Sequence, residues 1–161
     1  MKRLLFINIF LWQIVNLFAQ ISETKPFTIC DEKNIYSVDN YQLRAVLKDI
    51  KEPKSTPEYE GGTLEIRRYF DKITLDHSEN SEQVFRSYIS FIVNCEGQVG
   101  NYNILGNQPD SLRVLEEKII EKLKKMPNLW SIAENKGNKV DCYQVLVFTV
   151  LNGTFTNIFY K

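Results

Sequence analysis

Three cysteines and one histidine carry the most reactive side-chain chemistry in this chain of 161 residues. A structural zinc site needs about four ligands, and only His77 is available to join Cys30, Cys95 and Cys142. A catalytic cysteine needs a base or a cationic neighbourhood that lowers its pKa, and His77 lies in a separate polar loop. The sequence therefore predicts no metal site and no cysteine-based catalysis.

The other common catalytic patterns are also missing. No serine lies in a Gly-x-Ser-x-Gly elbow, and no helix directly follows Gly97 and Gly100, as a phosphate-binding loop would require. The carboxylates Glu116 and Glu117 are neighbours in sequence, and nothing places a second carboxylate opposite them in a cleft. We expect no enzymatic activity, no cofactor and no small-molecule substrate.

The charge pattern argues against a nucleic-acid partner. The chain has 20 basic and 20 acidic residues and a formal net charge of +0. Nucleic-acid binding leaves a basic arm or stripe in the sequence, and none is found here. No nucleic acid is expected among the partners.

The N-terminus is typical of an export signal. Two basic residues precede a mostly apolar stretch, residues 4–19, which ends at the small residue Ala19. This order predicts a signal peptide over residues 1–19 and a periplasmic protein. The alternative is an inner-membrane anchor formed by residues 4–19, but a spanning helix needs about 20 apolar residues.

The mature chain divides into a lead-in and a domain. Residues 20–56 are polar and contain no long periodic segment, so we interpret them as a lead-in that packs partly on the domain. Residues 57–161 form the predicted domain, which begins with a helix capped by Thr63 and running to about Lys72.

Two hairpins and a second helix follow in the domain. Residues 88–94 alternate as a strand does, and residues 98–105 return after a tight turn at Gly97. Residues 110–126 repeat apolar side chains at steps of three and four, which predicts an amphipathic helix. Residues 143–151 form a third, strongly apolar strand.

The end of the chain contains a hairpin signal. Asn152 and Gly153 lie between two strand-like segments, so residues 154–160 are expected to fold back on the third strand. The order predicts an α+β two-layer sandwich, in which one amphipathic helix covers a small antiparallel sheet. The predicted strand order is second, first, third, with a possible fourth strand.

This arrangement suggests a disulfide. Cys95 lies at the end of the first strand and Cys142 at the start of the third, and these ends meet if the strands are antiparallel neighbours. Cys95 and Cys142 are therefore the candidate disulfide, and the alternative is two independent buried thiols. Cys30, in the lead-in, has no evident partner.

Four short pieces, in order along about residues 57–151, resemble motifs of one family. They are Pro57 to Gly62 (Pro-x-aromatic-x-Gly-Gly), Phe91 to Val93 with Gly97 to Val99, Met126, Pro127 and Trp130, and Gly137 to Val140. Together they resemble the TonB C-terminal domain of the Bacteroidetes type. Two features depart from the pattern: Trp130 lies one residue late, and Ser131 and Ile132 replace the customary Lys-Pro.

The resemblance implies a protein-binding role in transmembrane transport. In this family the last strand of the sheet can receive an extended segment of an outer-membrane receptor by β-augmentation. The corresponding partner-binding residues here are Gln144, Val145, Leu146, Val147, Phe148, Thr149 and Val150. We therefore expect a TonB-like module that binds a segment of an outer-membrane receptor or periplasmic protein.

Two alternatives stay open at this stage. The same apolar strand can instead serve a self-associating structural domain that forms a homodimer without energy transduction. Alternatively, residues 154–160 can fold back through the Asn152–Gly153 turn and occupy the edge themselves.

Overall fold

The computed structural model describes residues 25–38, 43, 50–75 and 84–161. The predicted signal peptide, most of residues 41–50 and His77 lie outside the described residues. The elements, in chain order, are β1 (Tyr36–Ser37), α2 (Gly62–Phe70), β2 (Val84–Val93), β3 (Val99–Leu105), α3 (Asp110–Lys125), β4 (Ala133–Asn135), β5 (Asn138–Val140), β6 (Cys142–Leu151) and β7 (Thr154–Tyr160). The fold is α+β.

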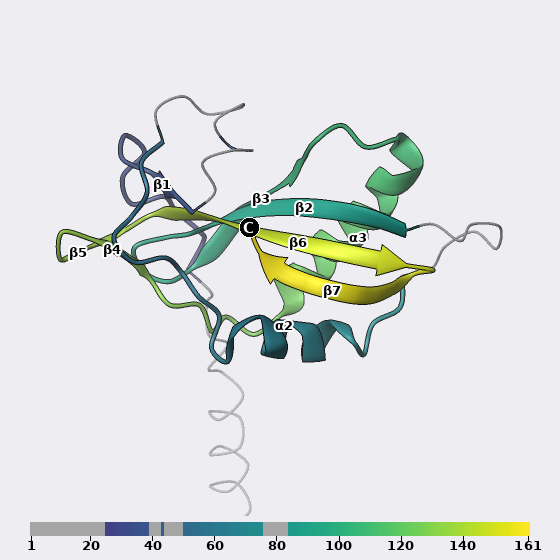
Figure 1. The fold of residues 1–161 in the computed structure, drawn as a ribbon. Coiled ribbons are helices and arrows are strands. Elements are labelled where there is room, and N and C mark those ends of the chain that lie inside the picture. Colours follow the sequence, from purple (N-terminus) through teal and green to yellow (C-terminus); the bar gives the residue numbers. More distant parts are fainter. Residues whose placement is uncertain (1–24, 39–42, 44–49, 76–83) are drawn as a thin grey trace, which may run out of the picture.

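A five-stranded sheet forms one layer (Figure 1). Its path is β1-β6-β2-β3, and β7 pairs with β6. The predicted order of second, first and third strand corresponds to β3-β2-β6 and is confirmed, as is the fourth strand, β7. The prediction of a wholly antiparallel sheet is wrong, because β1 pairs with β6 in parallel.

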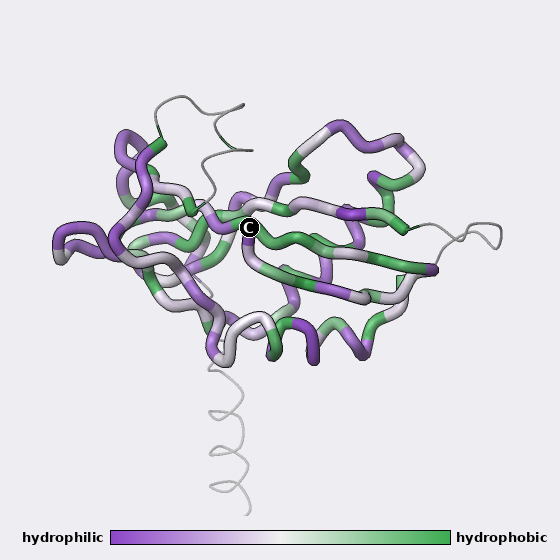
Figure 2. The backbone as a smooth tube through the Cα atoms, in the orientation of Figure 1, coloured by the Kyte–Doolittle hydropathy of each residue, from purple (hydrophilic) through white to green (hydrophobic). Residues whose placement is uncertain are grey.

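Alternation along β2 explains why the helices pack on one face of the sheet. Phe85, Ile89, Phe91 and Val93 are buried in the same core cluster as residues of both helices. Successive strand residues point to opposite faces, so these odd-numbered residues share the helix-facing side. Figure 2 shows the resulting apolar stretches along the central strands.

Two helices cover this face, rather than the single helix that was predicted. Ile66 and Phe70 of α2, and Ile119 and Leu123 of α3, are buried in the same cluster. The sequence had indicated both helices, but only the tertiary structure shows that both stripes are buried on one core.

The predicted Thr63 cap of the first helix is wrong. Gly61, in the left-handed region at φ 76°, is the N-cap of α2 in place of Thr63, and Pro109 is the N-cap of α3. Neither helix has a side-chain cap hydrogen bond. Gly61 suits this position because glycine carries no Cβ penalty at positive φ.

The opposite face of the sheet is covered in part by the lead-in. Leu43 is 2% exposed and clusters with Leu105 of β3 and Val145 of β6. Ile50 packs against the same cluster. This second, smaller core explains why both faces of β6 are apolar.

The polar segment before β6 is a small hairpin of its own. Residues 134–139, whose polar composition is that of a loop, contribute to the antiparallel strands β4 and β5. Lys136 at φ 51° and Gly137 at φ 80° form the turn between them. A two-residue hairpin turn of type I′ requires positive φ at both of its central residues.

Candidate functional site

The predicted binding strand is enclosed on both sides. β6 contains all seven predicted residues, and over them it pairs with β2 on one side. On the other side β7 pairs with β6 from Leu146 to Leu151, after a turn at Asn152 and Gly153 with φ of 49° and 74°. The alternative in which residues 154–160 occupy this edge is confirmed. No free edge is left at β6 for an added strand.

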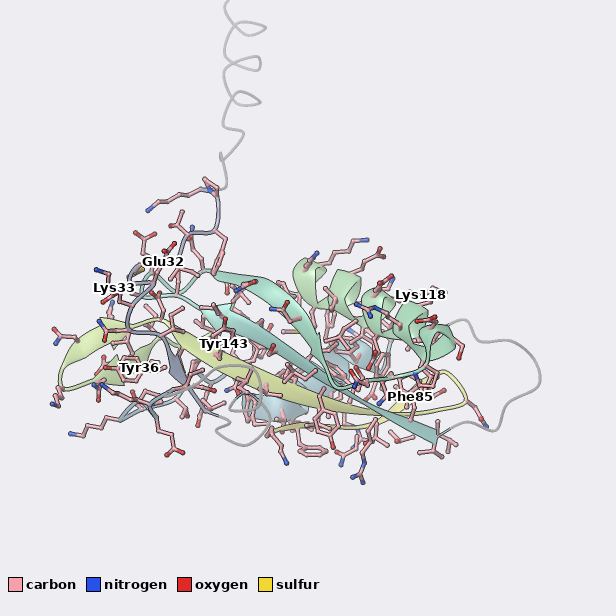
Figure 3. The ribbon with its side chains drawn as sticks, turned by 90° about the horizontal axis from the view of Figure 1, so that it is seen from above. Glu32, Lys33, Tyr36, Phe85, Lys118 and Tyr143 are labelled. Atoms are coloured by element: carbon pink, nitrogen blue, oxygen red, sulfur yellow. A yellow bond between two sulfur atoms is a disulfide. The ribbon has the colours of Figure 1, made fainter. Side chains whose placement is uncertain are left out.

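The start of the same edge is closed by the lead-in. The Tyr36 N–H donates to the Asp141 carbonyl at 2.9 Å, and the Val38 N–H donates to the Tyr143 carbonyl at 3.1 Å. Figure 3 shows Tyr36 and Tyr143 at the end of the sheet where β1 joins β6. Between β1 and β7, the Gln144 side chain accepts the Val145 N–H at 2.9 Å. Side chains and two strands therefore satisfy this edge together.

The free edge of the sheet lies one strand further out, on β7. The Lys161 N–H donates to the Val145 carbonyl at 3.1 Å. Residues that bond inward alternate along an antiparallel ladder with residues whose backbone groups point away. Counting back from Lys161, Phe159 and Asn157 bond to β6. Ile158 and Tyr160 consequently direct their N–H and C=O groups outward.

No other strand of the described residues pairs with these outward groups of Ile158 and Tyr160, although α2 packs against β7. Besides β6, the only pairing of β7 there is a single bridge between Thr74 and Thr154, at the turn end. At the other end the Tyr160 hydroxyl accepts the Tyr59 N–H at 3.0 Å. Thr156 is an extra residue in the register with β6, so the regular edge begins at Asn157.

The composition of β7 leaves this edge unprotected. Residues 154–160 contain no charged residue and no proline, which are common devices against edge-to-edge pairing. Phe155 and Ile158 are buried in the main core. Phe155 lies 4.9 Å from Phe70 of α2, centroid to centroid, so α2 packs directly against this strand.

The opposite edge, on β3, is a poorer template for an added strand. β3 carries one extra residue relative to β2, with Asn101 at φ 53°. A Cβ at Gly100 would lie 2.4 Å from the Phe27 ring, so the lead-in packs closely on this part of the strand. Bulges and covering segments are ways in which sheets protect an edge.

Two of the four family-like pieces meet in space. Tyr59 and Trp130 form an isolated antiparallel bridge, and their ring centroids are 5.4 Å apart. The Tyr59 hydroxyl donates to the Pro127 carbonyl at 3.2 Å. Trp130 also packs edge-on against Phe91 at 4.9 Å and is 9% exposed. It closes the helix–sheet core.

The predicted disulfide is wrong. Cys30 and Cys95 form the bond, across a sequence separation of 65, and Cys142 is free and buried. Burial raises the pKa of the Cys142 thiol to about 12, which makes it a poor nucleophile at neutral pH. Cys142 pairs with Val93 within the sheet, whereas Cys95 lies two residues further on, beyond the end of β2. The lead-in instead brings Cys30 to Cys95.

A buried carboxylate organises the region around the disulfide. Asp141, 1% exposed, accepts the N–H groups of Cys30 and Asp31 at 2.8 Å each, and that of Cys95 at 2.9 Å. One potential ligand atom each from Cys30, Cys95 and Asp141 lies within 4.8 Å of the others. Both sulfur atoms are bonded to each other, so this cluster is a structural clamp. The absence of a bound metal stays a prediction.

Glu116 is an unexpected buried charge. Its side chain is fully buried in α3 and its two carboxylate oxygens have no hydrogen-bond partner among the described residues, as is also true of the Ser87 hydroxyl. Desolvation by burial raises the pKa of Glu116, and the nearby Ser87 hydroxyl and the Arg113 charge oppose only part of that rise. The helical period could have revealed it, because Glu116 lies four residues after Leu112 and three before Ile119. Neighbouring Glu117 is exposed, so the two do not act as a pair.

Comparisons with known proteins give no family for this chain. No protein-family model, curated protein or solved structure matches it. Among the helices in the described ranges, none is long and apolar enough to cross a membrane.

Proposed function

We propose that this protein is an exported, TonB-like module that binds an extended segment of another protein by strand addition at the outer edge of β7. The partner is a periplasmic protein or the periplasmic segment of an outer-membrane receptor. The single observation that carries the proposal is the edge itself. Ile158 and Tyr160 present outward backbone groups on a strand without charge or proline.

The sequence and the topology support this proposal together. The family-like pieces occur in order along the chain, and the order β3-β2-β6, with α3 between β3 and β6, is the one predicted from the strand and helix patterns of the sequence. The edge lies one strand beyond the residues that the resemblance implied. An incoming strand would therefore pair with residues 157–160 and not with Gln144 to Val150.

The disulfide supports export. Disulfides persist in oxidising compartments such as the periplasm and are rare in the cytosol. Cys30–Cys95 joins the lead-in to the β2–β3 turn and so belongs to the folded domain. A periplasmic location agrees with the signal peptide predicted over residues 1–19.

The binding test places a photocrosslinking amino acid at exposed Asn157 of the exported protein in living cells. We expect a crosslink to one defined segment of a partner, located by mass spectrometry. A crosslink to a second copy of this chain would instead support the homodimer. Absence of any crosslink would contradict binding at this edge.

A matched pair of variants then separates backbone pairing from side-chain contact. Ile158→Pro removes an outward N–H, whereas Ile158→Ala removes the same buried side chain and keeps the N–H. With a synthetic peptide of the crosslinked segment, we expect binding to the Pro variant to be about five- to tenfold weaker than to the Ala variant, from the net value of one hydrogen bond. Equal affinities would contradict strand addition. Tyr160→Pro and Tyr160→Ala repeat the comparison at the second outward residue if Ile158→Pro does not fold.

A further inference from the structure

A cleft opens between the N-terminal strap, residues 25–31, and the C-terminal end of α3. Its volume is about 370 Å³, within the range of about 300–1,000 Å³ that is usual for small-ligand sites. The rings of Phe27, Tyr102 and Trp130 and the side chain of Met126 line it. None of its lining residues belongs to β7, so the cleft is separate from the proposed edge.

The strap forms a fixed wall of this cleft. The Cys30–Cys95 disulfide and the Asp141 carboxylate hold one end of the strap to the sheet. The Asn94 side chain donates to the Thr28 carbonyl at 2.8 Å, between that end and Phe27. The shape of the cleft is therefore set before any ligand enters, which lowers the entropic cost of binding.

The charges at the rim have one sign. Lys25 and Lys124 line the cleft, and no carboxylate is among its lining residues. The Lys25 ammonium forms an ion pair with the Glu96 carboxylate at 2.7 Å. The Lys124 ammonium lies 5.9 Å from the centroid of the Tyr102 ring and forms no ion pair with any described carboxylate.

We propose that this cleft binds a small aromatic carboxylate. The rings of Tyr102, Trp130 and Phe27 offer an apolar surface to an aromatic group. The Lys124 ammonium, at the rim, is placed to pair with a carboxylate of the ligand that stays close to water. Two features thus recognise the ligand: the aromatic lining gives affinity, and the lysine selects an acid over its neutral counterpart.

The test uses 3-phenylpropionate and its uncharged counterpart 3-phenylpropanamide with the exported protein. Isothermal titration calorimetry measures both affinities, and the indole N–H signal of Trp130 in ¹H–¹⁵N spectra reports where they bind. We expect saturable binding of the acid, about fivefold tighter than the amide, from one rim charge acting through water at about 4 Å. Both should shift the Trp130 signal.

Three variants complete the test. Lys124→Met keeps most of the apolar stem and should abolish the preference for the acid. Lys125→Met, at the next residue along α3 and also exposed, should leave the preference unchanged. Phe27→Ala should weaken the acid and the amide alike. The proposal is overturned by a lack of saturation at millimolar acid, by equal affinity for acid and amide, or by an acid preference that survives Lys124→Met.

Discussion

The disulfide between the strap and the β2–β3 turn should be a main source of stability. Its removal by the double substitution Cys30→Ala and Cys95→Ala leaves no unpaired thiol at either position. The bond closes a loop with a sequence separation of 65. Loop-closure entropy for a chain of that length corresponds to about 4 kcal/mol at 25 °C. We expect the free energy of unfolding to fall by about that amount.

We expect this loss of stability to arise in the unfolded state, because the native contacts of the strap do not depend on the disulfide. The Asp141 carboxylate still accepts the N–H groups of residues 30, 31 and 95 when the sulfur atoms are gone. Phe27 still packs on Gly100. The folded state therefore changes little, and the loss comes from the greater freedom of the unfolded chain.

Urea unfolding of the exported protein at neutral pH measures the difference. The slope with urea should rise in the double variant, because an uncrosslinked unfolded chain exposes more surface. Cys142→Ala is the matched control: it removes a buried thiol but leaves the disulfide, so it should cost only about 1 kcal/mol. Peptide mapping of the unreduced wild type should recover Cys30 linked to Cys95.

Two results would refute this reasoning. One is a Cys95–Cys142 linkage in the peptide map, which would restore the pairing that the sequence suggested. The other is a loss below about 1 kcal/mol in the double variant with an unchanged urea slope, which would show that the bond does not restrict the unfolded chain.

Three further predictions concern buried groups of the same fold. Because the folded state raises the pKa of Glu116 and so binds its proton more tightly than the unfolded chain, wild-type stability should fall as the pH rises from the ordinary pKa of a glutamate to the raised value. Glu116→Gln should remove that pH dependence and stabilise the protein at neutral pH, because the amide carries no charge to desolvate. Urea unfolding at both ends of the window checks it, and an unaltered pH profile would contradict it. Asp141→Asn supplies one acceptor oxygen where three N–H groups need two, so it should cost about 1–3 kcal/mol in the same assay. Gly100→Ala places a Cβ 2.4 Å from the Phe27 ring and should cost about 1–3 kcal/mol of stability, because the strap must move. In the Phe27→Ala background, where the space is clear, most of that cost should disappear. An undiminished loss there would show that the contact with Phe27 is not its cause.

Local signals in the sequence predicted much of the sheet. Gly97 indicated the first turn and takes φ 80°, and Asn152 and Gly153 indicated the last hairpin and form it. Such turns depend on backbone preferences of one or two residues, so the sequence carries them directly. The apolar repeat of α3 was predicted equally directly, because helix periodicity is a local property of the sequence.

The site residues were harder to predict because they depend on long-range pairing. The choice of Cys95 and Cys142 assumed that strand ends in register bring their side chains together. Cys142 is opposite Val93, however, and the lead-in carries Cys30 to Cys95 from 65 residues away. A polar segment without periodicity gives no sign of the path it will take across a sheet.

By itself, the sequence determined the α+β class and the strand order β3-β2-β6, and it indicated the fold-back of β7 without deciding it, since each follows from short-range patterns and the short connections between them. Only the tertiary structure decided which edge is free, which cysteines are joined and that Glu116 is buried. These properties depend on segments that meet from distant parts of the chain. The contacts that stabilise these properties exist only once the core has formed.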